Sequence, residues 1–364
     1  MNRGAGVVAA AIGGIAAALL VAGAAVCLTT GCSTVGYYAR SVTGHLELLQ
    51  AARPVPQWLD DPATDAALKE RLALSQRIRD FAVAALAEPD NASYRRYADL
   101  HRPAAVWNVV AAPELSLAPK TWCFWVVGCV GYRGYYAPAG AEALAAELRT
   151  EGLDVAVYPV PAYSTLGRLP TGGWLADPLL NTFIGYPEGE LARLIFHELA
   201  HQVAFAPGDT LFNESFASSV EKIGAERWLA ERAAPTARAE YDVTEARRAD
   251  FRALTSRYRD ELARLYASAQ GDDAKRAGKA AVLERLRADY AAMKVTRWNG
   301  YAGYDAWFAQ ANNAAFGVLA SYTGLVPAFE KLFEREGRDF PRFYAEVRRI
   351  AALATAERHA ALER

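Results

Sequence analysis

The sequence carries almost no excess of charge of either sign. Its 364 residues include 40 lysines and arginines and 41 aspartates and glutamates, which leaves a formal net charge of −1 at pH 7. No stretch alternates basic with aromatic residues, the pattern that would indicate a surface for nucleic acid. The composition therefore predicts no nucleic-acid partner.

Histidine is scarce, because the chain has only five. Two of them, His197 and His201, fall in the stretch FHELAHQ together with Glu198. Apolar residues recur at helical spacing from Pro187 onward, so both imidazoles should project from one face of a helix. With so few histidines, a random HExxH match in a chain of this length has a probability of roughly 1% or less.

An HExxH helix is a typical zinc site. Two imidazoles one turn apart can hold a zinc ion, and the glutamate beside the first can take a proton from the zinc-bound water. A catalytic zinc needs a third protein ligand and one open position. The alternative is a structural pair, in which both histidines are half-buried and hydrogen-bonded without a metal.

The third ligand has two candidates on the helix that should follow. PGDT at residues 207–210 indicates a turn, and Asn213 is expected to cap a helix through ESFASSVEKIGAERWLA. On that helix Glu214 and Glu221 share one face, thirteen and twenty residues after His201. Either carboxylate could therefore face the metal, with the other beside it.

The stretch HELAHQ followed by NESFASSVE resembles the gluzincin metallopeptidases, notably the aminopeptidase N-type enzymes. In those enzymes a glutamate of the second helix is the third zinc ligand, and another glutamate often follows seven positions later. The resemblance assigns zinc to His197, His201 and Glu214. It leaves Glu221 to orient a ligand, or to be the alternative ligand at a thermolysin-like spacing. The connecting loop is shorter here, and no GAMEN-like segment, which reads a free amino terminus in that family, is visible.

A closer resemblance covers nearly the whole mature chain. GCSTVGYYARSVTGHLELLQAARPV, NASYRRYADL, VWNVVAAPELSLAPKTWCF and VPAYSTLG, with the HELAHQ block, look like the bacterial family of predicted aminopeptidases that are secreted lipoproteins. The resemblance implies a zinc-dependent peptidase in which Glu198 activates the water. An envelope endopeptidase acting on proteins or cell-wall peptides, and a non-catalytic envelope scaffold with a vestigial metal site, are the alternatives.

The first 31 residues have the layout of a signal peptide, and their end resembles a bacterial lipobox. Arg3 supplies a small positive region, an apolar run over residues 4–28 follows, and LTTGC ends at Cys32. Cys32 is therefore expected to carry lipid and to anchor the protein in the cell envelope, where its peptide substrates lie in the periplasm. Ser33 beside it suits the outer membrane of a Gram-negative cell. An uncleaved transmembrane anchor is the alternative.

Only two cysteines are expected to remain available for pairing once the leader is removed and Cys32 is lipidated. The chain has four, of which Cys27 leaves with the signal peptide and Cys32 carries lipid, so Cys123 and Cys129 can pair. An oxidising compartment and the five residues between them favour a disulfide. Two buried free thiols are the alternative.

The fold is expected to be α+β and mostly helical, in a zincin-like arrangement. Helices are predicted over residues 33–52 and 62–88. Strands are predicted in AAVWNVVAA, TWCFWVVGCVGYRGYY and LDVAVYPV, with a helix in APAGAEALAAELRTEG. Because this small sheet precedes the HExxH helix, residues 162–166 are expected either at an edge that pairs with the substrate backbone or in an ordinary loop.

Three parts are expected along the chain. They are a signal peptide at residues 1–31, the N-terminal helices, sheet and zinc-binding helices at residues 32–228, and a helical C-terminal subdomain at residues 229–364. The last part should contain a hairpin of two long helices joined at QGDD, with a solvated charged face or, alternatively, a partner-binding coiled coil. Tyr301, Tyr304 and Tyr322 are expected to be core aromatics, although one of them could stabilise an oxyanion. The oligomeric state is left open.

Overall fold

The computed structural model describes residues 32–124, 128–162 and 175–363, and the chain divides into two compact units, residues 1–50 and 51–364. Helix α2 (Cys32–Ala51) contains the whole described part of the first unit, in agreement with the helix predicted over residues 33–52. The expected signal peptide lies outside the described residues. In the part of the chain that the structure describes, no helix combines the length and the apolar character needed to cross a membrane.

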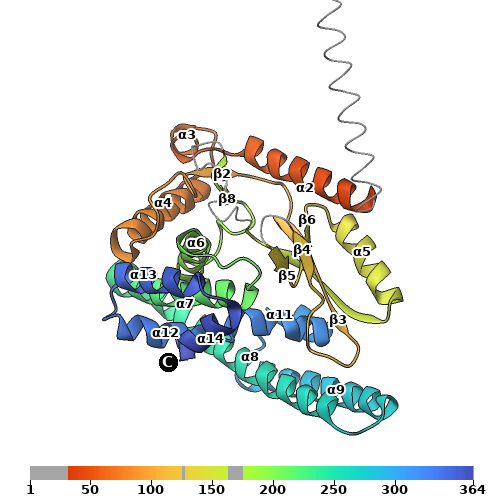
Figure 1. The fold of residues 1–364 in the computed structure, drawn as a ribbon. Coiled ribbons are helices and arrows are strands. Elements are labelled where there is room, and N and C mark those ends of the chain that lie inside the picture. The colour runs from red at the N-terminus through yellow and green to blue at the C-terminus, as the bar shows by residue number, and fades with distance from the viewer. Residues whose placement is uncertain (1–31, 125–127, 163–174, 364) are drawn as a thin grey trace, which may run out of the picture. The chain divides into compact units, whose positions relative to one another are not determined.

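The second unit is mostly helical with small sheets, in agreement with the α+β prediction (Figure 1). Its helices are α3 (Val55–Asp60), α4 (Ala66–Leu86), α5 (Pro138–Thr150), α6 (Glu188–Val203), α7 (Thr210–Glu231), α8 (Pro235–Ala267), α9 (Asp272–Thr296), α10 (Asp305–Ala309), α11 (Asn313–Thr323), α12 (Val326–Arg335), α13 (Phe340–Ala351) and α14 (Thr355–Glu363). Its strands are β1 (Arg53–Pro54), β2 (Arg96–Ala98), β3 (Val106–Pro113), β4 (Trp122–Phe124), β5 (Gly128–Val130), β6 (Arg133–Tyr135), β7 (Leu153–Val160) and β8 (Leu179–Leu180). Among the described residues they pair in the orders β1-β2-β8, β6-β3-β7 and β4-β5.

The sheet β6-β3-β7 has a helix on each face. Successive side chains of a strand point to opposite faces. Val109 and Ala111 of β3 therefore pack against α5, whereas Val110 and Ala112 pack against α11. β7 is the last strand in this order among the described residues, and it pairs with β3 along its whole length.

Helices α6 and α7 lie side by side and pack closely (Figure 1). α6 buries apolar residues at helical spacing, among them Leu191, Ile195 and Leu199. Gly224 of α7 permits the close approach, because a Cβ there would lie only 2.8 Å from Cδ2 of Phe196. The carboxylates of α7 are therefore held directly opposite the histidines of α6.

The start of α7 differs from the prediction. Asp209, not Asn213, caps the helix, since Asp209 Oδ1 accepts a hydrogen bond from the Phe212 N–H at 3.0 Å. Asn213 lies within the helix and is buried, where it donates to the Ala206 carbonyl at 2.8 Å and accepts from the Ala206 N–H at 2.7 Å. Aspartate and asparagine are both good N-caps, so the sequence alone could not show which of the two residues begins α7. Asn213 instead fastens the loop between α6 and α7 and thereby sets the position of Glu214.

The boundary expected between residues 228 and 229 falls inside α7, and residues 51–364 form one compact unit. α7 is buried from both sides, because its Gly224 lies close to Phe196 of α6 while its Phe216 packs on Phe329 of α12 and Phe343 of α13. The C-terminal helices therefore complete the core around the HExxH segment. The expected hairpin is present as α8 and α9, which pack against each other (Figure 1).

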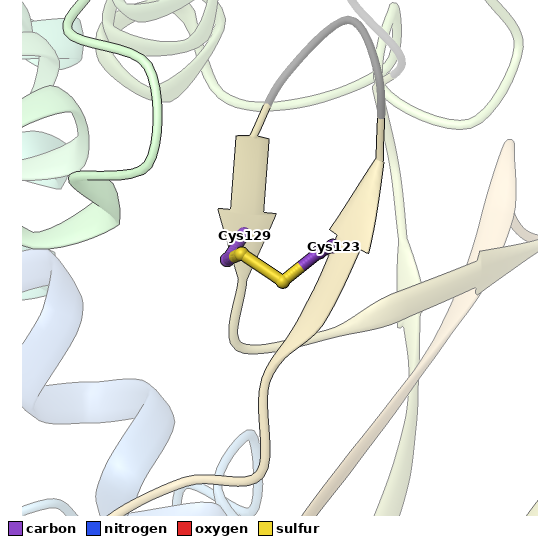
Figure 2. Close-up of a disulfide and its surroundings, with 2 residues drawn as sticks. All are labelled: Cys123 and Cys129. Atoms are coloured by element: carbon purple, nitrogen blue, oxygen red, sulfur yellow. A yellow bond between two sulfur atoms is a disulfide. The ribbon is translucent and has the colours of Figure 1, made fainter.

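Cys123 and Cys129 form a disulfide between directly opposed positions of β4 and β5 (Figure 2). Both residues are exposed. The bond therefore joins the two strands at positions that lie on the surface of the molecule.

Replacing Cys123 and Cys129 by serine should lower the free energy of unfolding by about 2 kcal/mol, because the short closed loop loses its restriction in the unfolded chain. Urea denaturation measures the change. The unaltered protein under a reductant should show the same loss. Mass spectrometry of unreduced peptides checks the link itself, and two free thiols in protein from an oxidising compartment would contradict it.

Candidate metal centre

The HExxH helix and α7 bring three possible ligand atoms together. His197 Nε2 lies 3.2 Å from His201 Nε2, because the two residues are one turn apart on α6. Glu214 Oε2 of α7 lies 3.3 Å from His197 Nε2 and 3.7 Å from His201 Nε2. Within the described residues, these three side chains form the group of histidine and acidic ligands that could hold a metal ion.

The triangle of ligand atoms has the size that zinc requires. Zinc–nitrogen and zinc–oxygen bonds of about 2.0–2.2 Å at tetrahedral angles place neighbouring ligand atoms about 3.3 Å apart. The edges of 3.2, 3.3 and 3.7 Å lie close to this value. Two imidazoles and one carboxylate also form a donor set of catalytic zinc, and they leave one position for water or substrate.

Glu221 contacts the other nitrogen of His197. The distance from His197 Nδ1 to Glu221 Oε2 is 2.9 Å. A carboxylate that accepts a hydrogen bond from Nδ1 fixes the tautomer whose Nε2 can bind a metal. In the structure Glu214 therefore lies near Nε2 of His197, and Glu221 lies near Nδ1 of the same ring.

Glu221 is ionised although it lies in a buried site. Burial alone would raise the pKa of its carboxyl, but Arg193 and His197 lower that pKa to about 2. Burial alone would also raise the pKa of Glu214, but His201 and His197 hold that pKa well below its ordinary value. Both carboxylates therefore remain negative at neutral pH, as a cation site requires.

Arg193 is a residue that the sequence analysis did not single out. It is 8% exposed, and its guanidinium pairs with Glu221 and, at 2.8 Å, with Glu245 of α8. A buried charge is costly unless it is paired. One sequence feature could have identified Arg193: it is the single charged residue in the apolar stretch LARLIF, four residues before His197. Arg193 thus ties α6 to α7 and α8 one turn before His197, a candidate ligand.

Glu198 lines a cavity of about 650 Å³ next to His197. The walls of the cavity come from α6, α7, α8, α12 and the segment that follows β7. Burial raises the pKa of Glu198 above its ordinary value, against the opposing effect of His197 and His201. A raised carboxyl pKa suits a group that takes up and returns a proton near neutral pH.

The end of β7 reaches the same cavity. Val160, Pro161 and Ala162 line it. A strand at the end of a sheet can add an extended peptide as a further strand. The remainder of the expected edge segment, residues 163–166, lies outside the described residues.

The C-terminal tyrosines have different surroundings. Tyr304 stacks on Phe251 with ring centroids 4.4 Å apart and also lines the cavity. Tyr301 is 41% exposed, so the prediction of a core role is wrong for it. Tyr322 belongs to α11, but its side chain lies outside the described part of the structure.

Tyr158 of β7 is a further residue that the sequence analysis did not identify. Burial raises its pKa to about 12, and the nearby charge of Glu214 contributes to the increase. The side-chain amide of Asn108 lies 3.4 Å from the Tyr158 hydroxyl. Tyr158 therefore has a neutral hydroxyl that is close enough to Glu214, the third candidate ligand, to be affected by its charge.

Comparison with known proteins gives a match to one family. The family described as "Putative aminopeptidase" matches residues 36–362, which include the candidate metal centre, the cavity and the C-terminal helices. Searches of the curated proteins and of the solved structures found no match.

Proposed function

This chain belongs to the putative aminopeptidase family, and from that premise we propose that it is a zinc-dependent peptidase that shortens peptides from their amino end. The observation that carries the proposal is the triangle of His197, His201 and Glu214, which fits zinc and lies beside Glu198 at an open cavity. The HExxH helix followed by a helix with the ligand glutamate supports a place among the gluzincins, with a zincin-like arrangement of the site.

The residues around the site have distinct roles in this proposal. His197, His201 and Glu214 hold the zinc, which when bound polarises the scissile carbonyl and lowers the pKa of water. Glu198 takes the proton of the attacking water and returns it to the leaving amine. Glu221, held in place by Arg193, keeps the imidazole of His197 oriented.

A digest of a peptide library by the zinc-loaded protein tests the proposal. Products shortened by one residue at the amino end support an aminopeptidase. Internal cuts would instead favour an endopeptidase acting on envelope proteins or cell-wall peptides. Stoichiometric zinc without cleavage of any peptide would contradict a peptidase and favour a scaffold.

The proposed place of action is the cell envelope, with a lipid at Cys32 as the anchor and peptide substrates in the periplasm. This part rests on the layout of the leader, in which an apolar run ends at a cysteine. Sorting to the outer membrane of a Gram-negative cell is part of the same proposal.

Cys32→Ser should abolish the incorporation of labelled palmitate, because the small residue Gly31 precedes Cys32 whereas the bulkier Val26 precedes Cys27. Cys27→Ser is the matched control and should keep the label. Metabolic labelling followed by immunoprecipitation measures the result. Label that persists in Cys32→Ser would contradict the lipoprotein assignment.

A further inference from the structure

A second hollow lies next to the cavity of His197 and Glu198, along the seam between α7 and α12. The second hollow, of about 910 Å³, is lined along α7 as far as Ala230 and along α12 as far as Glu334. Lys222, Pro327 and Glu330 line both hollows. The two spaces therefore meet at these three residues.

An ion pair crosses the seam at this meeting point. Lys222 of α7 donates a hydrogen bond from Nζ to Oε1 of Glu330 in α12, at 2.6 Å. The two side chains are 40% and 32% exposed. An ion pair that is so open to water contributes little to the stability of the fold. Stability therefore does not explain why the pair lies where the two hollows meet.

We propose that the pair of Lys222 and Glu330 is a partition that closes one end of the catalytic cavity and directs the enzyme to short peptides. The inference rests on the proposed peptidase function. A short peptide fits within the hollow that contains His197 and Glu198, whereas a longer chain that continues along α7 meets the paired side chains. The two side chains can separate, because water reaches their contact. A long peptide must supply the free energy of this separation, so its binding is weakened by that amount.

The space beyond the pair has the length to hold peptide. From Lys222 to Ala230, α7 rises by about 12 Å, which corresponds to about three or four residues of extended chain. Both hollows have walls from α7 and α12. Removal of the partition should therefore join them into one longer groove.

The test is the double variant Lys222→Ser with Glu330→Ser, which removes both long side chains and leaves no unpaired charge. The measured quantity is the ratio of kcat/KM for a dodecapeptide to kcat/KM for a tripeptide. The ratio should rise about two- to fivefold, because parting an ion pair that is this exposed costs at most about 1 kcal/mol. Dissociation constants of the same peptides, measured in a Glu198→Gln background, should show the same shift without turnover.

Two controls separate the partition from other effects. Lys222→Glu with Glu330→Lys rebuilds the pair in reverse and should keep the length ratio of the unaltered protein. Glu346→Ser with Arg349→Ser removes an ion pair of the same 2.6 Å length that lines neither hollow, and it should also keep that ratio.

The outcomes distinguish this inference from the proposed function. An unchanged ratio in the serine double variant, while the tripeptide is still cleaved, overturns the partition and leaves the peptidase proposal standing. An equal rise in the variant with the reversed pair also overturns the partition. If the unaltered zinc-loaded protein cleaves no peptide of any length, the proposed function is wrong, and the partition is wrong with it.

Discussion

Glu198→Gln should leave zinc bound while hydrolysis falls by about 10²- to 10⁴-fold, because glutamine keeps the shape of the side chain but cannot exchange the proton. Glu198 lines the cavity and is not one of the three candidate ligands, so its replacement leaves the donor triangle intact. Zinc content by atomic emission and kcat are measured on the same sample. Loss of zinc together with activity would mean that Glu198 contributes to the metal site itself.

Variants of the ligands provide the contrast. His197→Ala, His201→Ala and Glu214→Ala should each lose zinc as well as activity, because each deletes a donor atom. Glu221→Ala should weaken zinc affinity by about 10- to 100-fold without emptying the site, since it removes only the partner of His197 Nδ1. If Glu221→Ala strips the metal and Glu214→Ala retains it, the roles of the two glutamates are reversed.

Arg193→Met should lower the free energy of unfolding by about 3 kcal/mol, because it leaves Glu221 in a buried site without its guanidinium partner. The side chains of Arg193 and Glu221 are 10% and 16% exposed. We expect the lower end of the range for a broken buried pair, since Arg248 still pairs with Glu245 and His197 still contacts Glu221. Urea denaturation measures the loss, and Arg349→Met, at an exposed pair, should change stability by no more than about 0.5 kcal/mol.

The pH dependence of this difference identifies its cause. The pKa of Glu221 is depressed to about 2 in the folded protein, so the stabilisation that Arg193 provides is fully present above the ordinary carboxyl pKa. It should be lost as the pH falls from about 4.5 toward 2. A difference between Arg193→Met and the unaltered protein that stays constant over this interval would indicate lost packing, not lost charge pairing.

The local features of the site could be predicted from the sequence, because helical periodicity depends on neighbouring residues. The HExxH segment forms α6, and its histidines share a face. The choice between Glu214 and Glu221 could not be made from spacing alone, since both lie on one face of α7. It depends on how α7 is set against α6, which the contact of Asn213 with Ala206 and the close packing at Gly224 determine.

Features that depend on distant partners were not predictable from the sequence. Arg193 stands out in an apolar helix, but its partner Glu245 is 52 residues further along the chain. The pair of Lys222 and Glu330 spans 108 residues. The burial of α7 against Phe329 of α12 and Phe343 of α13 likewise cannot be seen in the α7 segment itself.

His197 lies between two carboxylates, Glu214 and Glu221, and these can stabilise either a proton or a metal ion on its imidazole. Burial alone would lower the pKa of His197, but hydrogen bonds to Glu214 and Glu221 raise it well above its ordinary value. A raised pKa favours the protonated imidazole, so an incoming metal competes with a proton for His197. Acidification should therefore weaken metal binding at this site, because the proton and the metal compete for the same imidazole.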